Sequence, residues 1–428
     1  MKYYRSKYQY CRKIISFICL FTTISIQAKD YVITDYGVKN DSTLLQTLAI
    51  QNVIDIAANN GGGSIIVPKG TFLSGALFFK PGTKLVLNEN AVLKGSDEIK
   101  DYPLLPSRME GKNIYYYAAL LNAYYVKGFS IKGSGTVNGN GLKFWNLFWT
   151  SRETAKKTGK VCTNLEVSRP RLVFVWGCDS VTFSGVKFIN SGYWTTHFYR
   201  CNDLLIENCE MHAPRKPIRA PSTDAIDLDV CKRVIIRGCY ISTDDDGVCI
   251  KGGKGPLAHK SDENGLVEDV LVENCTFGPN LHGTLTMGSE AIHARNIILR
   301  NCIVNNTCAL LRLKMRPDTY QIYENITIEN VQGTCGSIID LKYWNQFFTL
   351  EGSNEKPFGI VKDIAFKNIN VNCINSFGYM KGNKNDVVNN ILFENVNARN
   401  KANSFINIYK EATKLDNVIV NGKELCFE

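Results

Sequence analysis

The sequence of 428 residues lacks several patterns that mark whole classes of protein. After residue 28 no apolar run is long enough to cross a bilayer, which predicts that no helix spans a membrane. There is no basic arm and no recognisable nucleic-acid motif, so we expect no nucleic acid among the partners. No pair of cysteines has the C-x-x-C spacing of a zinc site, and we expect neither a metal nor a cofactor.

Fifteen cysteines would suit a disulfide-rich protein, but their positions favour a different interpretation. Four of them share one local frame, with Cys209 and Cys275 in ENC, Cys239 in RGC and Cys302 in RNC. Free cysteine packs as a small apolar side chain, so a cysteine that recurs at one place in successive strands indicates a column of buried thiols. We therefore predict few disulfides.

Residues 1–28 have the pattern of a secretory signal peptide. Five basic residues precede an apolar run from Ile14 to Ile26, and Ala28 is a small residue before the cleavage site. Loss of the five basic residues would lower the formal net charge from +10 to +5. We expect an exported protein, periplasmic or secreted. No linker divides residues 29–428, so we predict a single domain. We also expect a monomer.

From residue 181 onward, one short pattern repeats. The eight units are VTFSGVKF at Val181, LLIENCEM at Leu204, VIIRGCYI at Val234, VLVENCTF at Val270, IILRNCIV at Ile297, ITIENVQG at Ile326, IAFKNINV at Ile364 and ILFENVNA at Ile391. Such a unit cannot bury its own apolar face, so the units must stack, and the sequence predicts an all-β solenoid. The Asn or Gly in each unit marks a bend, where Asn tolerates left-handed backbone and can bond to the next coil.

The segments before the repeat have other patterns. Ser42 is a candidate N-cap for a helix through Ala57, and such a helix would cap the open end of the coil stack. Residues 102–117 are rich in aromatic side chains, and residues 143–168 are expected to form a surface loop with helical turns. Both segments could wall off one end of a binding cleft.

Four polar clusters lie on four consecutive loops between repeats. They read STDAIDLD at 222–229, STDDDGVCIKGG at 242–253, LHGTLTMGSE at 281–290 and LRLKMRPD at 311–318. In stacked coils, Asp224 would lie close to Asp245 and Asp246. Clustered carboxyl groups are what glycosidic cleavage needs, one as a proton donor and another to activate water. Three of them cannot all ionise freely, so one should keep its proton near neutral pH.

Other charged residues of these clusters have simpler interpretations. Arg312 and Lys314 are two apart on an extended strand, so they point to one face and can hold one anion together. Lys251 and Lys254 would add positive charge for an acidic glycan. Asp-rich turns are commonly solvated loop corners, and we expect Asp244 to lie in solvent.

The order of these motifs resembles glycoside hydrolase family 28, the polygalacturonase-like pectin hydrolases. That family shows NTD, a DD pair, GHG and RIK in this order. The present chain reads STD at 222–224, DD at 245–246, LHG at 281–283 and RLK at 312–314. The resemblance covers nearly the whole mature chain and implies a right-handed parallel β-helix. Ser222 and Leu281 replace the family's Asn and first Gly, which leaves the ionisable groups of the motifs in place.

Carried over position by position, the resemblance implies roles for the polar residues. Asp245 would be the general acid that protonates the leaving oxygen. Asp224 and Asp246 would activate water for attack from the opposite face, which gives inversion. His282 would orient or polarise the acid, and the pair Arg312–Lys314 would bind the substrate carboxylate.

Three further residues are candidate substrate contacts. Trp194 and His197 fall one coil before Asp224 and could form a wall on which a sugar stacks. Tyr343, on the loop after the Arg/Lys pair, resembles a family tyrosine near the bound sugar.

The resemblance implies a hydrolase of α-linked galacturonic acid in acidic pectic polysaccharides or oligosaccharides. We expect exo action, as a galacturonidase on rhamnogalacturonan or homogalacturonan fragments. An endo-polygalacturonase and a rhamnogalacturonan hydrolase are alternatives. A pectate-lyase-like enzyme would use the acidic turns as Ca²⁺ ligands, and a non-catalytic solenoid would bind glycan without turnover.

Overall fold

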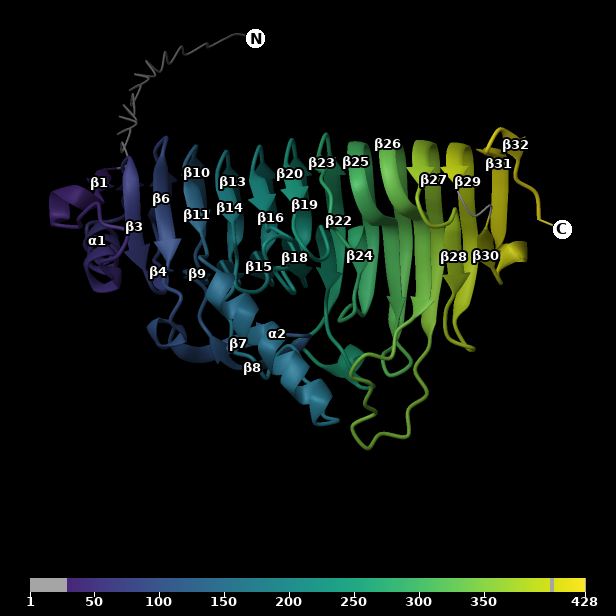
Figure 1. Cartoon of the computed structure of the whole chain (residues 1–428), viewed down its shortest axis with the longest axis horizontal. Coiled ribbons are helices and arrows are strands. Elements are labelled where there is room, and N and C mark those ends of the chain that lie inside the picture. Colours follow the sequence, from purple (N-terminus) through teal and green to yellow (C-terminus); the bar gives the residue numbers. More distant parts are fainter. Residues whose placement is uncertain (1–28, 401–403, 428) are drawn as a thin grey trace, which may run out of the picture.

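The computed structural model describes residues 29–400 and 404–427, so the predicted signal peptide lies outside the described residues. Parallel strands form three long ladders, to each of which successive coils of the chain contribute. Figure 1 shows the coils stacked along one axis, from the end that carries α1 to the C-terminal end. The architecture is a right-handed parallel β-helix, as the repeat and the resemblance predicted.

Most strands each belong to only one of the three ladders. The first ladder contains β1 (Asp30–Val32), β2 (Gly63–Val67), β5 (Thr83–Leu87), β10 (Ser130–Gly133), β13 (Asp179–Ser184), β16 (Asn202–Glu207), β19 (Lys232–Arg237) and β22 (Leu266–Glu273). The second contains β3 (Gly70–Ser74), β6 (Ala91–Gly95), β11 (Thr136–Asn138), β14 (Lys187–Ile189), β17 (Glu210–His212), β20 (Tyr240–Ser242) and β23 (Thr276–Phe277). The third contains β4 (Leu77–Phe79), β9 (Leu121–Tyr124), β12 (Val173–Trp176), β15 (Thr196–Tyr199), β18 (Ile226–Asp229), β21 (Val248–Lys251), β24 (Gly283–Met287), β28 (Gly378–Lys381) and β30 (Phe405–Asn407).

Towards the C-terminus the strands bend and continue from one ladder into the next. These long strands are β25 (His293–Met315), β26 (Gln321–Tyr343), β27 (Gly359–Cys373), β29 (Val387–Asn400) and β31 (Thr413–Val420). The short β32 (Lys423–Glu424) pairs antiparallel with β31. Four short 3₁₀ helices complete the described elements, namely η1 (Ile33–Tyr36), η2 (Ile99–Asp101), η3 (Ala258–Lys260) and η4 (Lys410–Ala412).

The core lies inside the coils and follows from the alternation of side chains along each strand. In β19, Val234 and Ile236 are buried, whereas Ile235 and Arg237 are exposed. Inward positions pair in register from coil to coil, as Leu204 with Val234 and Val234 with Val270. Every repeat therefore extends one continuous apolar core.

The bend between the first and second ladders carries the predicted asparagines. Six of them have φ between 52° and 55°, namely Asn208, Asn274, Asn301, Asn330, Asn368 and Asn395. Asn368 Nδ2 donates a hydrogen bond to Asn330 Oδ1, and Asn330 Nδ2 donates one to Asn301 Oδ1, each at 3.0 Å. The predicted left-handed backbone is confirmed for all six, and the predicted bond between coils is confirmed for Asn301, Asn330, Asn368 and Asn395.

The recurring cysteines follow that bend. Cys209, Cys239, Cys275 and Cys302 are buried free thiols, which confirms the predicted column. Each Sγ lies near a backbone carbonyl, as for Cys302 and Arg300 O at 3.2 Å.

The N-terminal helix α1 (Thr47–Asn59) packs against β2, β3, β4 and β5 and covers the end of the coil stack, as predicted. It begins at Thr47 rather than Ser42, because the preceding residue Leu45 forms a bridge with Leu73 at the edge of a strand. Leu48, which is 87% exposed, does not join the buried face. Gln51 Nε2 donates to Phe78 O at 3.0 Å, and Gln51 Oε1 accepts from Phe78 N at 2.8 Å.

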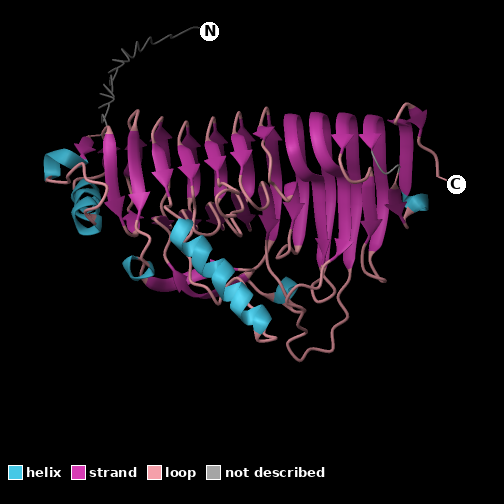
Figure 2. Ribbon diagram, in the orientation of Figure 1, coloured by secondary structure: helices cyan, strands magenta, loops and turns pink. Residues whose placement is uncertain are grey.

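Three segments project from the side of the third ladder (Figures 1 and 2). They are the antiparallel hairpin of β7 (Leu104–Met109) and β8 (Lys112–Tyr117), the helix α2 (Leu142–Lys157) and the loop 344–358. Helical turns were predicted within a surface loop at 143–168, and the first part of this segment is instead one regular helix, of which Phe144, Trp145 and Phe148 bury one face. Among the described residues, no helix combines the length and apolarity needed to cross a membrane.

We predict that the asparagine ladder contributes measurably to stability. Asn330→Ala should lower the free energy of unfolding by about 2–3 kcal/mol, since it removes two hydrogen bonds and leaves a side chain in left-handed backbone. Asn330→Gly should cost less, about 1–2 kcal/mol, because glycine adopts this backbone freely. The measurement is denaturant unfolding. The exposed Asn389→Ala is the control and should change stability by less than about 0.5 kcal/mol. Equal effects of Asn330→Ala and Asn389→Ala would contradict the prediction.

Candidate active site

The outer face of the third ladder brings together polar residues from consecutive coils. His197, Asp227, Cys249, Thr286 and Arg312 are register partners on β15, β18, β21, β24 and β25, so their side chains form one row. The strand positions two residues further along form a second row, which contains Asp229 and Lys251. A cavity of about 330 Å³ opens above these rows.

The three projecting segments form the walls of this pocket. Glu110 comes from the turn of the β7–β8 hairpin, Trp149 from α2, and Trp344 from the loop 344–358. Lys112 of the hairpin forms an ion pair with Glu351 of the loop, and Lys254 lies 3.5 Å from Glu110. The hairpin and the loop are thus joined across one side of the pocket.

Asp246 lies on the pocket floor and is completely buried. Its carboxylate accepts hydrogen bonds from Lys314 Nζ at 2.7 Å, Thr286 Oγ1 at 2.9 Å and Arg312 Nη1 at 3.3 Å. Burial disfavours its charge, but the two cations outweigh burial and hold the pKa of Asp246 well below its usual range. Asp246 is therefore ionised near neutral pH.

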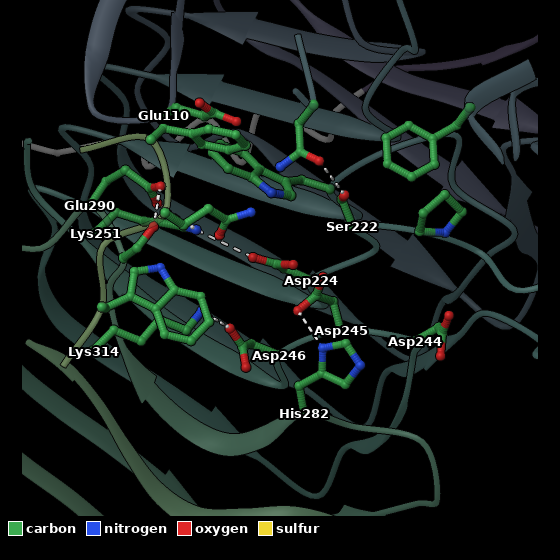
Figure 3. Close-up of a pocket in the computed structure, with 18 of the residues that line it drawn as sticks. Glu110, Ser222, Asp224, Asp244, Asp245, Asp246, Lys251, His282, Glu290 and Lys314 are labelled. Atoms are coloured by element: carbon green, nitrogen blue, oxygen red, sulfur yellow. Dashed lines mark hydrogen bonds and ion pairs between the residues drawn. The ribbon is translucent and has the colours of Figure 1, made fainter. Parts of the chain in front are cut away.

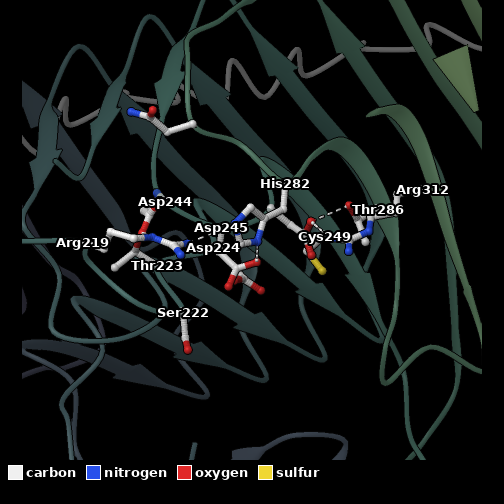
Figure 4. A network of polar contacts seen from close by, with 12 residues as sticks. Arg219, Ser222, Thr223, Asp224, Asp244, Asp245, Cys249, His282, Thr286 and Arg312 are labelled. Carbon is white, nitrogen blue, oxygen red and sulfur yellow. Dashed lines mark hydrogen bonds and ion pairs between the residues drawn. The ribbon is translucent and has the colours of Figure 1, made fainter. Parts of the chain in front are cut away.

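Asp245 and His282 form a pair at the pocket wall (Figures 3 and 4). His282 Nδ1 lies 3.1 Å from Asp245 Oδ1. The negative charge of Asp245 raises the pKa of His282. Burial works to raise the pKa of Asp245, but the imidazolium charge and hydrogen bond of His282 outweigh burial and lower it. The pair consequently holds its proton on the imidazole when the pocket is empty.

Asp224 faces the same pocket and has the opposite electrostatic behaviour. It is 4% exposed, and Lys251 Nζ lies 3.3 Å from its Oδ2. Burial, together with the negative charge of Asp245, raises the pKa of Asp224 to about 7. The sequence predicted that one clustered carboxyl would keep its proton near neutral pH. In the empty pocket this carboxyl is Asp224, whereas the resemblance gave the acid role to Asp245.

Asp244 is a correction to the sequence analysis, which placed it in solvent. Its side chain is completely buried, and its carboxylate accepts hydrogen bonds from Arg215 Nε at 2.5 Å and Arg219 Nε at 2.9 Å. Arg219 Nη2 also lies 3.3 Å from His282 Nε2. Figure 4 shows Asp244, Arg219 and His282 along one network. Asp244 therefore fixes an arginine beside the Asp245–His282 pair.

The three remaining candidates lie in different places. Trp194 lines the pocket, but it is buried, and Lys251 Nζ lies 4.3 Å from the centre of its ring. His197 is completely buried beneath the pocket floor, with Nδ1 2.8 Å from Arg171 Nη1, so it has no surface to offer a substrate. Tyr343 is 50% exposed and does not line the pocket; its neighbour Trp344 does.

Several residues of the pocket were not found from the sequence. Trp344 lies over Arg312 and Lys314, with their charges 5.1 Å and 5.2 Å from its ring centre. Glu110 and Glu290 bring carboxylates from a hairpin turn and from the loop after β24. Glu290 ends the polar cluster at 281–290 but was not singled out within it, and Glu110 has no recognisable motif. The aromatic content of residues 102–117 was the signal that pointed to the hairpin.

One group of buried residues has the composition of a metal site. Asp224, Asp227 and Cys249 offer ligand atoms that lie within 4.8 Å of one another. However, Lys251 Nζ is 3.3 Å from a carboxyl oxygen of both aspartates and already supplies a positive charge there. A divalent cation beside this ammonium group would be repelled, so the donor set does not fit one.

One protein-family model matches most of the length of the chain. The family model for glycosyl hydrolases family 28 matches residues 59–420. A probable polygalacturonase from Vitis vinifera is 28% identical over 242 residues, which cover 54% of this chain and 46% of that protein. The match thus spans about half the length of that relative.

Other relatives match over more of their length. An exopolygalacturonase from Zea mays is 26% identical over 353 residues, covering 79% of this chain and 75% of that protein. An endo-polygalacturonase from Pectobacterium carotovorum subsp. carotovorum is 25% identical over 387 residues, covering 85% and 89%. The crystal structure of a hyperthermoactive exopolygalacturonase from Thermotoga maritima has a TM-score of 0.76 at 23% identity and covers 92% of both chains, which shows the shared fold.

We predict that the raised pKa of Asp224 can be measured directly. In protein labelled with ¹³C at the aspartate carboxyl groups, one signal should titrate with a midpoint near pH 7. This titration should be absent in Asp224→Asn. An Asp246→Asn variant should remove a signal that does not titrate at all between pH 4 and pH 8, because Lys314 keeps that carboxylate ionised. If every aspartate titrates below about pH 5, close to the ordinary range, the electrostatic description of Asp224 is wrong.

Proposed function

The chain belongs to glycosyl hydrolases family 28, and we propose that it hydrolyses α-linked galacturonic acid in pectic polysaccharides or oligosaccharides, from a chain end and with inversion. The observation that carries this proposal is the pocket itself. It places Asp224, Asp245 and Asp246 beside the cations Arg312 and Lys314, inside walls built by three projecting segments. Carboxyl groups to exchange protons and cations to hold an acidic sugar are what this reaction requires.

Asp246 is suited to activate water. It is ionised because Lys314 and Arg312 compensate its charge, and a carboxylate in this state can accept a proton from an attacking water molecule. Asp224 can assist once it has lost its own proton. Both carboxylates face the pocket from neighbouring coils.

Asp245 is suited to protonate the leaving oxygen, with His282 as its source of protons. A proton on His282 Nδ1 lies within hydrogen-bond distance of Asp245 Oδ1. It can pass to Asp245 as negative charge develops on the leaving oxygen, and Asp245 then delivers a proton to that oxygen. Arg219, held by Asp244, stands at the other nitrogen of His282 and keeps the ring in place.

Arg312 and Lys314 can hold the carboxylate of the galacturonic acid that enters the pocket. In the empty pocket they contact Asp246, yet both side chains also line the cavity. An incoming carboxylate could share these cations with Asp246, and the face of Trp344 beside them offers an apolar surface for a sugar ring. This arrangement favours an acidic sugar over a neutral one.

The walls of the pocket support exo action. A long groove would admit the middle of a polymer. Here Glu110 from the hairpin, Trp149 from α2 and Phe347 from the loop surround the same cavity. The volume of about 330 Å³ is at the low end of ligand pockets, which are typically about 300–1,000 Å³. Such a pocket suits the end of a chain. We also propose that residues 1–28 direct export, which would bring the enzyme to pectic substrates.

Product analysis tests the activity and the exo action together. Purified mature protein is incubated with de-esterified homogalacturonan and, separately, with rhamnogalacturonan oligosaccharides. We expect free galacturonic acid as the sole early product, with NMR showing inverted configuration at the released anomeric carbon. A ladder of oligomers would establish endo action instead. An unsaturated product, or binding without turnover, would overturn the hydrolase proposal.

The choice of acid can be decided by the leaving group. Asp245→Asn should slow hydrolysis of oligogalacturonides by about 10²–10⁴-fold, the usual contribution of a general acid. On an aryl galacturonide with a nitrophenolate leaving group, which departs without a proton, the same variant should lose far less.

Asp224→Asn is the matched variant and should be slow on both substrates, because water activation is needed for each. The opposite pattern, with Asp224→Asn spared on the aryl substrate, would transfer the acid role to Asp224. Circular dichroism and thermal unfolding should show that both variants remain folded.

A further inference from the structure

At the floor of the pocket lies a buried cluster that the reaction described above does not use in full. Lys251 Nζ lies 3.3 Å from carboxyl oxygens of three acids, Asp224, Asp227 and Glu290. All four side chains are at least nine-tenths buried. Figure 3 shows Lys251 between Asp224 and Glu290. Three carboxyl groups thus share one ammonium group with little access to solvent.

If all three acids were ionised, three negative charges would face the single positive charge of Lys251 in a buried place. An uncompensated buried carboxylate is strongly unfavourable, and it takes up a proton instead. Glu290 has further support, because Ser289 Oγ donates to its Oε1 at 2.5 Å. Lys251 and Lys254 outweigh burial there, so the pKa of Glu290 is lowered. The proton that this cluster takes up must therefore be held by Asp224 or Asp227.

Asp227 is the acid with the poorest compensation. It is completely buried, and within the described part of the chain neither of its oxygens has a hydrogen-bond donor in good geometry. Lys251 is near Oδ1, but it directs its hydrogen bonds to Asp224 Oδ2 and Glu290 Oε2. Burial raises the pKa of Asp227 well above its usual range, and the charge of Asp224 adds to this, although Lys251 acts in the other direction.

Among the described groups around Asp227, Asp224 is the one that can accept a hydrogen bond from its protonated carboxyl group. Along the row, its register partners are His197 on β15 and Cys249 on β21. His197 is engaged by Arg171, and its pKa is lowered to about 3 by burial, so it is neutral. Cys249 Sγ lies 3.0 Å from Gly288 O, to which it donates. Burial raises the pKa of Cys249, so it is a neutral thiol. One carboxyl oxygen of Asp224 lies within 4.8 Å of one of Asp227, and a hydrogen bond between the two side chains is among the causes that raise the pKa of Asp227.

We propose that Asp227 is a positioning residue that stays protonated at neutral pH and donates a hydrogen bond from its carboxyl group to the carboxylate of Asp224. The donated hydrogen bond favours the ionised form of Asp224, which is the form that can accept a proton from water. It also fixes the direction in which the remaining oxygen of Asp224 points. This inference rests on the proposed role of Asp224, but the proton on Asp227 can be tested without any turnover.

The first test is the pH dependence of thermal stability of Asp227→Asn. A raised folded-state pKa means that the wild type loses stability as the pH rises above the unfolded value near 4. The amide cannot ionise, so the variant escapes this loss. The melting temperature of Asp227→Asn minus that of the wild type should therefore rise by at least ~2 °C from pH 4 to pH 8.

Asp229→Asn is the matched control on the same strand. Asp229 is equally buried, but Arg108 Nε donates to its Oδ2 at 2.9 Å and outweighs burial, so its pKa is lowered. Its contribution to stability is complete above the unfolded value and is lost only in more acidic solution. The difference for Asp229→Asn should therefore be constant from pH 4 to pH 8. A constant difference for Asp227→Asn as well would overturn the proposal.

The second test is kinetic and depends on turnover. Asp227→Ala removes the donor, so kcat should fall roughly 10- to 100-fold with KM changed by less than about threefold. The acidic limb of the pH profile of kcat/KM should move to higher pH, because Asp224 loses a hydrogen bond that favours its charge. Asp227→Asn keeps an N–H donor and no charge, so it should restore most of kcat and return the limb to its wild-type position.

The outcomes separate the possible roles. If the acidic limb of the pH profile of kcat/KM lies a unit or more lower in Asp227→Asn than in the wild type, Asp227 is an anion in the wild type and the proposal is wrong. A loss of thermal stability in Asp227→Ala with an unchanged pH profile would reduce Asp227 to a structural residue. If the wild type releases no galacturonic acid, the proposed function fails, whereas the thermal test still decides the protonation of Asp227.

Discussion

Parallel pairing of successive coils in register brings side chains from distant parts of the sequence to neighbouring positions. Asp227, Cys249, Thr286 and Arg312 stand in one row because each strand of the third ladder pairs with the next without a shift. Neighbouring strands lie about 4.8 Å apart, so ionisable groups in such a row interact directly. The positions of the reactive groups are consequently set by backbone hydrogen bonds, and only the pocket walls are formed by the projecting segments.

Burial then decides how charge is distributed among the acids beside these rows. Asp246 is compensated by Lys314 and Arg312, and it is ionised. Asp224 shares Lys251 with two other acids, so its compensation is incomplete and it retains a proton up to a higher pH. Carboxyl groups of one type in one pocket thus acquire different proton affinities from the cations that the neighbouring coils supply.

Much of this arrangement could be predicted from the sequence because it follows from periodicity. The repeating unit indicated the ladders, the asparagine bends and the thiol column, and the four motifs indicated which loops would meet. The same reasoning failed where a contact depends on a segment outside the repeat. Asp244 resembled a solvated corner, yet Arg215 and Arg219 from the preceding loop cover it. Trp344 follows Tyr343 directly, and only the path of the loop decides which of the two side chains lines the pocket.

Substrate binding changes the electrostatic surroundings of Asp245. Asp245 has a lowered pKa because the charge and hydrogen bond of His282 outweigh burial. An acidic sugar adds a carboxylate next to Arg312 and Lys314, and its negative charge raises the proton affinity of every acid nearby. Entry of the sugar also excludes water, which disfavours a charged Asp245 further. Substrate binding therefore acts in the direction that moves the proton from His282 to Asp245, so a carboxyl that is ionised in the free enzyme can serve as the acid in the complex.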